Sequence, residues 1–105
     1  MLSKKQTKEL SLRLWGYLKK NPTLYKESVS PELLKEVKDF CNFSPLCGYF
    51  CEDDCKSADG ELCPSRPICS NKNEIKYHHY VVGDLKARTR VINAIYDLIA
   101  KWSVE

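Results

Sequence analysis

All six cysteines of this chain lie between residues 41 and 69, and none lies in the arms on either side. Five, three, three, seven and five residues separate the successive cysteines. Proline and glycine interrupt regular secondary structure, and they recur in this stretch as Pro45, Gly48, Gly60, Pro64 and Pro67. We therefore expect residues 41–69 to form a loop-rich cysteine module whose shape depends on what its thiols bind.

The arm before the cysteine module carries a clear helical pattern. Leu10, Leu14 and Leu18 recur every four residues, which is the spacing of one face of a helix. This pattern predicts a helix over residues 4–20, with Ser3 as its N-cap.

Two further helices flank the cysteine module. Ser30 followed by proline suits an N-cap and the first helical position, which predicts a helix over residues 31–40. After the module, apolar residues at three- and four-residue intervals predict a last helix over residues 84–102. The expected fold is mainly α: a small bundle of about three helices, with the cysteine module inserted between the second and the last.

Two shorter segments carry weaker local patterns than these helices. Residues 75–82 have the composition of a β-strand but no partner strand, so we expect extended chain that packs on the helices. Residues 47–56 fit a short helix. In a continuous helix Cys47 and Cys55 are about 12 Å apart along the axis, too far to share one tetrahedral metal, so they share one only if the helix breaks between them.

Length and composition indicate a single folded domain over residues 1–105. The chain is 43% hydrophobic and 30% charged, as in ordinary folded proteins. The residues that follow Met1 lack the apolar core of a signal peptide, and no run is long enough to span a bilayer. We therefore expect a cytoplasmic protein with no membrane partner.

Charge is distributed unevenly, although the net charge of +3 is too small to indicate nucleic-acid binding by itself. The first arm is basic and the cysteine module is acidic. Such charges usually form solvated surfaces. The alternative hypothesis is a nucleic-acid interface made by basic residues of the outer helices, namely Lys4, Lys5, Lys8, Arg88 and Arg90.

In a reducing compartment, clustered cysteines are more often metal ligands than disulfides. Zinc is the expected metal, because four thiolates satisfy its tetrahedral preference and its binding stabilises a loop-rich segment. An iron–sulfur cluster, disulfides and redox-active thiols are the alternatives. The adjacent pair His78 and His79 is expected to pack or to form surface hydrogen bonds rather than to bind metal.

The order of motifs resembles a group of small uncharacterised phage and bacterial proteins, whose core is Cys-Pro-Leu-Cys followed by a second Cys-Pro step. The motifs are a Trp-bearing first helix, Ser44-Pro45-Leu46-Cys47, Leu62-Cys63-Pro64, Cys69 and an amphipathic last helix ending in Trp102. The resemblance covers most of the chain and implies a metal-binding knuckle without an established activity. A phage origin would place the protein in the host cytoplasm.

This resemblance also implies a set of ligands, which are Cys47, Cys55, Cys63 and Cys69. Ser44 stands where the first cysteine of the knuckle is expected, and Cys41 or Cys51 is the reserve for that position. The chain contains no nucleophile elbow, phosphate-binding glycine loop or catalytic metal motif. We therefore expect a non-enzymatic module that binds another protein, with nucleic-acid binding as the alternative.

Overall fold

The computed structural model describes residues 2–40, 43–50, 56–57, 60–69 and 74–104. The chain is mainly helical, which confirms the predicted fold class. The helices are α1 (Lys4–Lys20), the 3₁₀ helix η1 (Lys26–Ser28), α2 (Pro31–Val37), α3 (Pro45–Tyr49), α4 (Arg66–Cys69), α5 (His78–Val82) and α6 (Leu85–Lys101). The described residues form no strand, only an isolated antiparallel bridge between Lys56 and Leu62.

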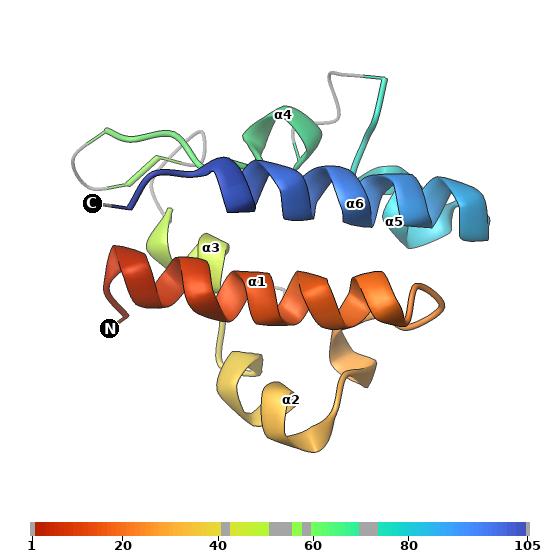
Figure 1. Cartoon of the computed structure of the whole chain (residues 1–105), viewed down its shortest axis with the longest axis horizontal. Helices are drawn as coiled ribbons and strands as arrows, with labels where there is room; N and C mark the ends of the chain where they lie inside the picture. Colours follow the sequence, from red (N-terminus) through yellow and green to blue (C-terminus); the bar gives the residue numbers. More distant parts are fainter. Residues whose placement is uncertain (1, 41–42, 51–55, 58–59, 70–73, 105) are drawn as a thin grey trace.

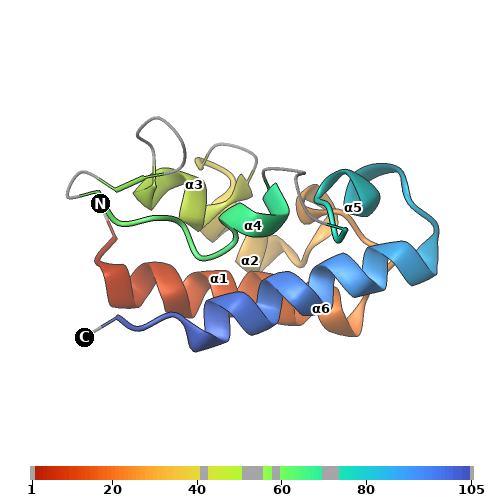
Figure 2. The same cartoon turned by 90° about the horizontal axis from the view of Figure 1, so that it is seen from above.

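The two long helices, α1 and α6, lie side by side and run antiparallel (Figure 1). Both chain ends therefore lie at the same end of the molecule. Figure 2 shows α1 and α6 along one face, with the short helices α3, α4 and α5 in a row on the other. The described part of the cysteine module thus packs on one face of the helix pair.

The ends of both long helices follow from local sequence. The Ser3 hydroxyl accepts a hydrogen bond from the backbone of Gln6, and the Gln6 side chain accepts one from the backbone of Ser3. This reciprocal capping box satisfies two N–H groups that would lack partners within the helix. Asp84 caps α6 in a similar way through the backbone N–H of Ala87. The predicted bounds of both helices are accurate to one residue.

The prediction for residues 75–82 is wrong, because His78–Val82 forms the helix α5. Tyr80 is 1% exposed and packs edge-on against Trp15, so burial of the aromatic ring outweighs the strand composition.

The middle helices also differ from expectation. Helix α2 ends at Val37 rather than at residue 40. Residues 47–56 do not form one continuous helix, because α3 starts at Pro45 behind the N-cap Ser44 and ends at Tyr49. The break that a metal shared by Cys47 and Cys55 requires is therefore present.

The core is apolar and extends along the whole α1–α6 interface. Its fully buried members come chiefly from these two helices, with contributions from α2, α3, α4 and α5; they include Leu14, Leu18, Val37, Leu46, Ile68, Tyr80, Ile92, Ile95 and Ile99. Burial of apolar area on this scale supplies most of the stabilisation of a small helical domain. None of the helices that the structure describes has both the length and the apolar character needed to cross a bilayer.

Candidate functional site

Three cysteines line one pocket of about 180 Å³, which we call the thiol pocket. Cys47 comes from α3, Cys63 from the segment before α4, and Cys69 from the end of α4. Ser44 and Ser65 lie in the same wall. No disulfide joins any two of these three cysteines. Three of the four proposed metal ligands thus line the same pocket, although they come from separate segments.

Ser65 lies between two of the thiols. Its hydroxyl oxygen is 3.2 Å from Sγ of Cys63 and 3.4 Å from Sγ of Cys69. Ser65 is 3% exposed, and its backbone carbonyl accepts the N–H of Cys69, which begins the turn of α4. On the opposite side, the Ser44 hydroxyl accepts the N–H of Cys47 at 3.4 Å. Both serines therefore hold backbone or thiol groups of the pocket in place.

The remaining wall of the thiol pocket is largely aromatic. Trp15, Phe50 and Tyr77 line it together with Lys26. The Lys26 ammonium lies 5.8 Å from the ring centre of Trp15 and 5.1 Å from that of Tyr77, within range of cation–π attraction. The thiols therefore face a mostly apolar space with one buried cation beside it.

The described residues alone do not complete a metal site. Among them, no three His, Cys, Asp or Glu side chains are grouped so that they could hold a metal ion. Cys41, Cys51 and Cys55 lie outside the described residues. Three members of the predicted ligand set thus line one pocket without forming a group that could hold a metal ion, and zinc stays a prediction.

His78 and His79 belong to α5, and neither lines the thiol pocket. His79 instead borders a small hollow beside Arg90 and Glu74. Metal binding by these histidines therefore gains no support from their position.

Glu61 anchors the cysteine module to both long helices. It follows a turn in which Gly60 has φ of +89°, a left-handed conformation that favours glycine. One carboxylate oxygen of Glu61 lies 2.9 Å from Nζ of Lys4, and the other accepts Nε1–H of Trp102 at 2.8 Å. Part of the acidic module thus meets the basic arm within the same molecule.

The basic residues proposed for nucleic-acid binding are mostly engaged in internal contacts. Lys4 pairs with Glu61, and Nζ of Lys8 donates to the backbone carbonyls of Ala100 and Trp102. Arg90 lies 3.9 Å from Glu74, a long and exposed ion pair, and Lys5 is exposed. The predicted set therefore does not form one continuous cationic face.

Arg88 is the clearest departure from that hypothesis, because it is only 8% exposed. Its guanidinium carbon lies 4.1 Å from the ring centre of Tyr25 and 5.1 Å from that of Tyr80. Its Nη2 donates to the carbonyl of Leu24 at 2.7 Å. Arg88 thus fastens the loop after α1 to α6. Together with Trp15, Tyr25, Lys26, Tyr77 and Tyr80 it forms what we call the aromatic–cation cluster.

Burial changes the acidity of two phenols in this cluster. Desolvation raises the pKa of Tyr77 well above its ordinary value, and negative charge on Tyr80, Cys69 and Cys47 would raise it further. Desolvation likewise raises the pKa of Tyr80 to about 12, although the positive charge of Arg88 opposes this. Both phenols therefore stay protonated at neutral pH.

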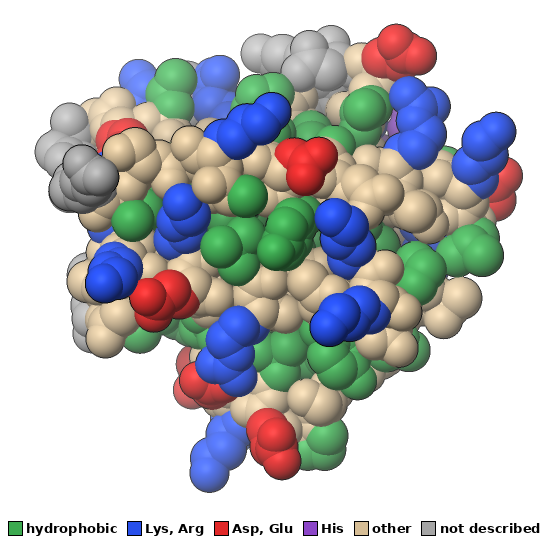
Figure 3. All heavy atoms as spheres, viewed as in Figure 1, with side chains coloured by type: hydrophobic (Ala, Val, Ile, Leu, Met, Phe, Trp, Pro, Cys, Tyr) green, Lys and Arg blue, Asp and Glu red, His purple; other side chains and the backbone are tan. Residues whose placement is uncertain are grey.

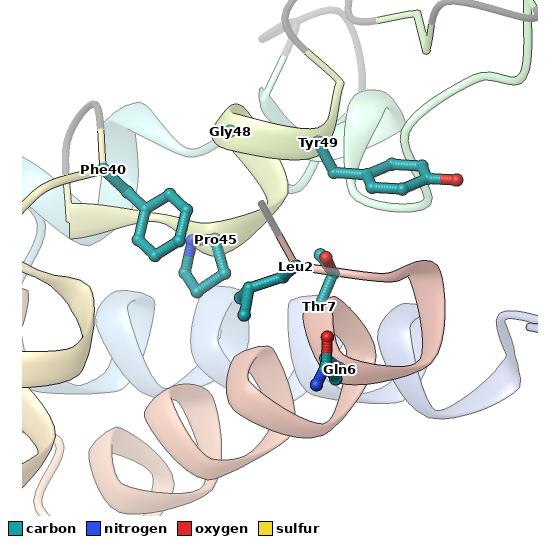
Figure 4. A pocket seen from close by; sticks show the side chains of 7 residues that line it. All are labelled: Leu2, Gln6, Thr7, Phe40, Pro45, Gly48 and Tyr49. Carbon is teal, nitrogen blue, oxygen red and sulfur yellow. The ribbon is translucent and has the colours of Figure 1, made fainter.

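A larger hollow of about 530 Å³ lies between the start of α1 and α3 (Figure 4). Leu2, Phe40 and Pro45 face it. Gly48 allows the close approach of Phe40, because a Cβ at that position would come within 2.5 Å of the ring. The polar groups of Gln6 and Thr7 already bond to Ser3. No described residue in its wall is a cysteine, a histidine or an acid, so we assign it no chemistry.

Sequence reasoning missed Ser65, Lys26 and the capping role of Ser44. Ser44-Pro45 repeats the serine–proline signal that correctly predicted the start of α2, so this cap was detectable. Burial of Lys26 has no comparable local signal, since it depends on rings that come from α1 and from the turn before α5.

Comparison of the chain with protein-family models, with curated proteins and with solved structures gave no match. The resemblance to small phage and bacterial proteins therefore stays a prediction.

Replacing Arg88 tests the aromatic–cation cluster. We expect Arg88→Ala to lower the free energy of unfolding by about 2 kcal/mol, because the partly buried carbonyl of Leu24 loses its charged donor and two rings lose their cation. Lys86→Ala, on the exposed side of the same helix, should change stability by less than about 0.5 kcal/mol. Denaturant unfolding measures both, and equal effects would contradict the assigned role.

Alkaline pH tests the two buried phenols. The folded chain holds their protons more tightly than the unfolded chain, in which tyrosine titrates at about pH 10. The contribution of the two phenols to the free energy of unfolding should be fully present below that pH and should be lost as the pH rises through about 12. Denaturant unfolding across this range measures the decline, and Tyr77→Phe should make it shallower. A free energy of unfolding that stays constant over the range would refute the burial argument.

Proposed function

We propose that this chain is a small, non-enzymatic protein-binding module whose cysteine module is closed by a structural metal ion. The observation that supports the proposal is that Cys47, Cys63 and Cys69, although separate in sequence, line one pocket. Four thiolates would satisfy zinc and leave no open coordination position for catalysis. Cys55 is the proposed fourth ligand, with Cys41 and Cys51 in reserve.

Ser65 fits this proposal as a supporting residue. Ligand sulfurs at metal sites are commonly oriented by neighbouring hydrogen-bond donors, and the Ser65 hydroxyl already lies within hydrogen-bond distance of two of the proposed ligands. Metal binding would then contribute directly to folding, because a loop-rich segment buries little apolar surface of its own.

Support for protein binding comes from exposed apolar side chains around the α5–α6 turn, which we call the corner patch. Val81, Val82 and Leu85 are 45%, 64% and 53% exposed. Tyr25 lies beside them, since its hydroxyl donates to the carbonyl of Val81 at 3.0 Å, and it is 37% exposed. Grouped apolar side chains on a surface typically mark contact with another protein.

Native mass spectrometry of the reduced protein tests the metal. We expect the mass to increase by one zinc ion, Cys63→Ser to lose that ion, and Cys41→Ser to retain it. A brown protein with a larger increment would replace zinc by an iron–sulfur cluster. A metal-free wild-type protein that is fully folded would refute the structural metal.

Affinity capture tests the protein-binding half of the proposal. The tagged chain should retain one stoichiometric protein from a lysate of the cells that produce it. Val82→Asp should lose that protein, because it places a charge in the corner patch, whereas Ser103→Asp at the exposed end of the chain should retain it. Absence of any stoichiometric partner of the wild-type chain would count against protein binding.

A further inference from the structure

The charges of the chain are unevenly distributed along its sequence. Helix α1 carries six basic residues and one acidic residue, and α6 carries four basic residues and one acidic residue. The rest of the chain holds seven basic and twelve acidic residues. The layer formed by α1 and α6 therefore carries an excess of basic residues, although Lys4 and Arg13 are ion-paired and Arg88 is buried. Figure 3 shows the face formed by α1 and α6, with hydrophobic side chains between the two helices and both basic and acidic ones around them.

A groove of about 390 Å³ opens on this layer between α1, α2 and α6, and we call it the basic groove. Leu12, Tyr17, Leu33 and Tyr96 give it apolar walls. Arg13 and Lys20 add positive charge, and no acidic residue is among the described residues that line it. Lys20 has no ion-pair partner in the part of the chain that the structure describes.

We propose that the basic groove binds an acidic segment of a partner protein, with apolar side chains of that segment seated between Leu12, Leu33 and the two tyrosines. The inference rests on the proposed protein-binding function and does not depend on the metal.

One of the two cations that line the groove is already paired with a carboxylate outside its lining. Nη2 of Arg13 lies 2.7 Å from a carboxylate oxygen of Glu36 in α2, and both side chains are about half exposed. Lys20, on the same helix as Arg13, could pair with a carboxylate of the bound segment. Cations spaced around apolar walls match a peptide in which acidic and apolar residues alternate, through charge complementarity and burial of apolar area.

The same geometry disfavours single-stranded nucleic acid as the occupant. Aromatic residues bind unpaired bases through open ring faces. The ammonium of Lys19 lies 4.7 Å from the ring centre of Tyr96 and covers one face of that ring. Two leucines in the wall suit aliphatic side chains better than bases or phosphates.

Fluorescence anisotropy of the full chain tests this proposal with three labelled probes. They are a sixteen-residue peptide of alternating Glu and Leu, the same peptide with Gln in place of Glu, and a single-stranded oligothymidine of sixteen nucleotides. We expect only the acidic peptide to bind well, and its affinity to fall as salt is raised.

Charge-reversed variants then locate the site. Lys20→Glu should weaken binding of the acidic peptide about fivefold, whereas Lys56→Glu makes the same change of charge outside the groove and should leave the affinity unchanged. Circular dichroism of both variants confirms that they are folded. Equal weakening by both variants, no binding of the acidic peptide, or tighter binding of the oligothymidine would overturn the proposal.

The outcome also separates this inference from the proposed function. If capture of the partner protein is lost in Val82→Asp but not in Lys20→Glu, and the acidic peptide does not bind, the proposal for the basic groove is wrong while the protein-binding function stands. If the peptide does not bind and no protein is captured, both are wrong.

Discussion

Burial of two cations among aromatic rings is the interaction on which the rest of this structure depends. Arg88 and Lys26 lie almost entirely out of water, and aromatic rings pack against both. The rings of Trp15, Tyr77 and Tyr80 and the carbonyl of Leu24 offset part of the lost hydration, while Nε of Arg88 has no hydrogen-bond partner among the described residues. Because the participants come from α1, the following loop, α5 and α6, the cluster determines how these elements meet.

Sequence predicted the parts of the fold that depend on local chemistry. The bounds of α1 and α6 follow from leucine and isoleucine spacing and from the caps Ser3 and Asp84. The structure of residues 78–82 could not be predicted in this way, because their helix depends on packing of Tyr80 against Trp15, which is distant in sequence. Tertiary packing overrides weak local preference in such short segments.

The residues of the candidate site were also predictable only in part. The family resemblance implied Cys47, Cys55, Cys63 and Cys69 as ligands, and three of these four residues line one pocket. The roles of the basic residues were less predictable, because the sequence pattern of a helix does not show whether a lysine or arginine faces solvent or an aromatic ring. Arg88 is buried and Lys8 caps carbonyl groups of α6, whereas Lys20 faces the basic groove. These roles depend on how the helices and the loop after α1 pack against one another.

The positions of the two tryptophans give the chain two independent optical reporters. Trp15 lies within the aromatic–cation cluster, whereas Trp102 donates to Glu61 at the end of α6. Indole emission depends on its polar neighbours, so each ring senses a different end of the helix pair. A variant that keeps Trp15 alone would report the docking of the loop after α1. One that keeps Trp102 alone would report whether the turn carrying Glu61 stays attached to the helices.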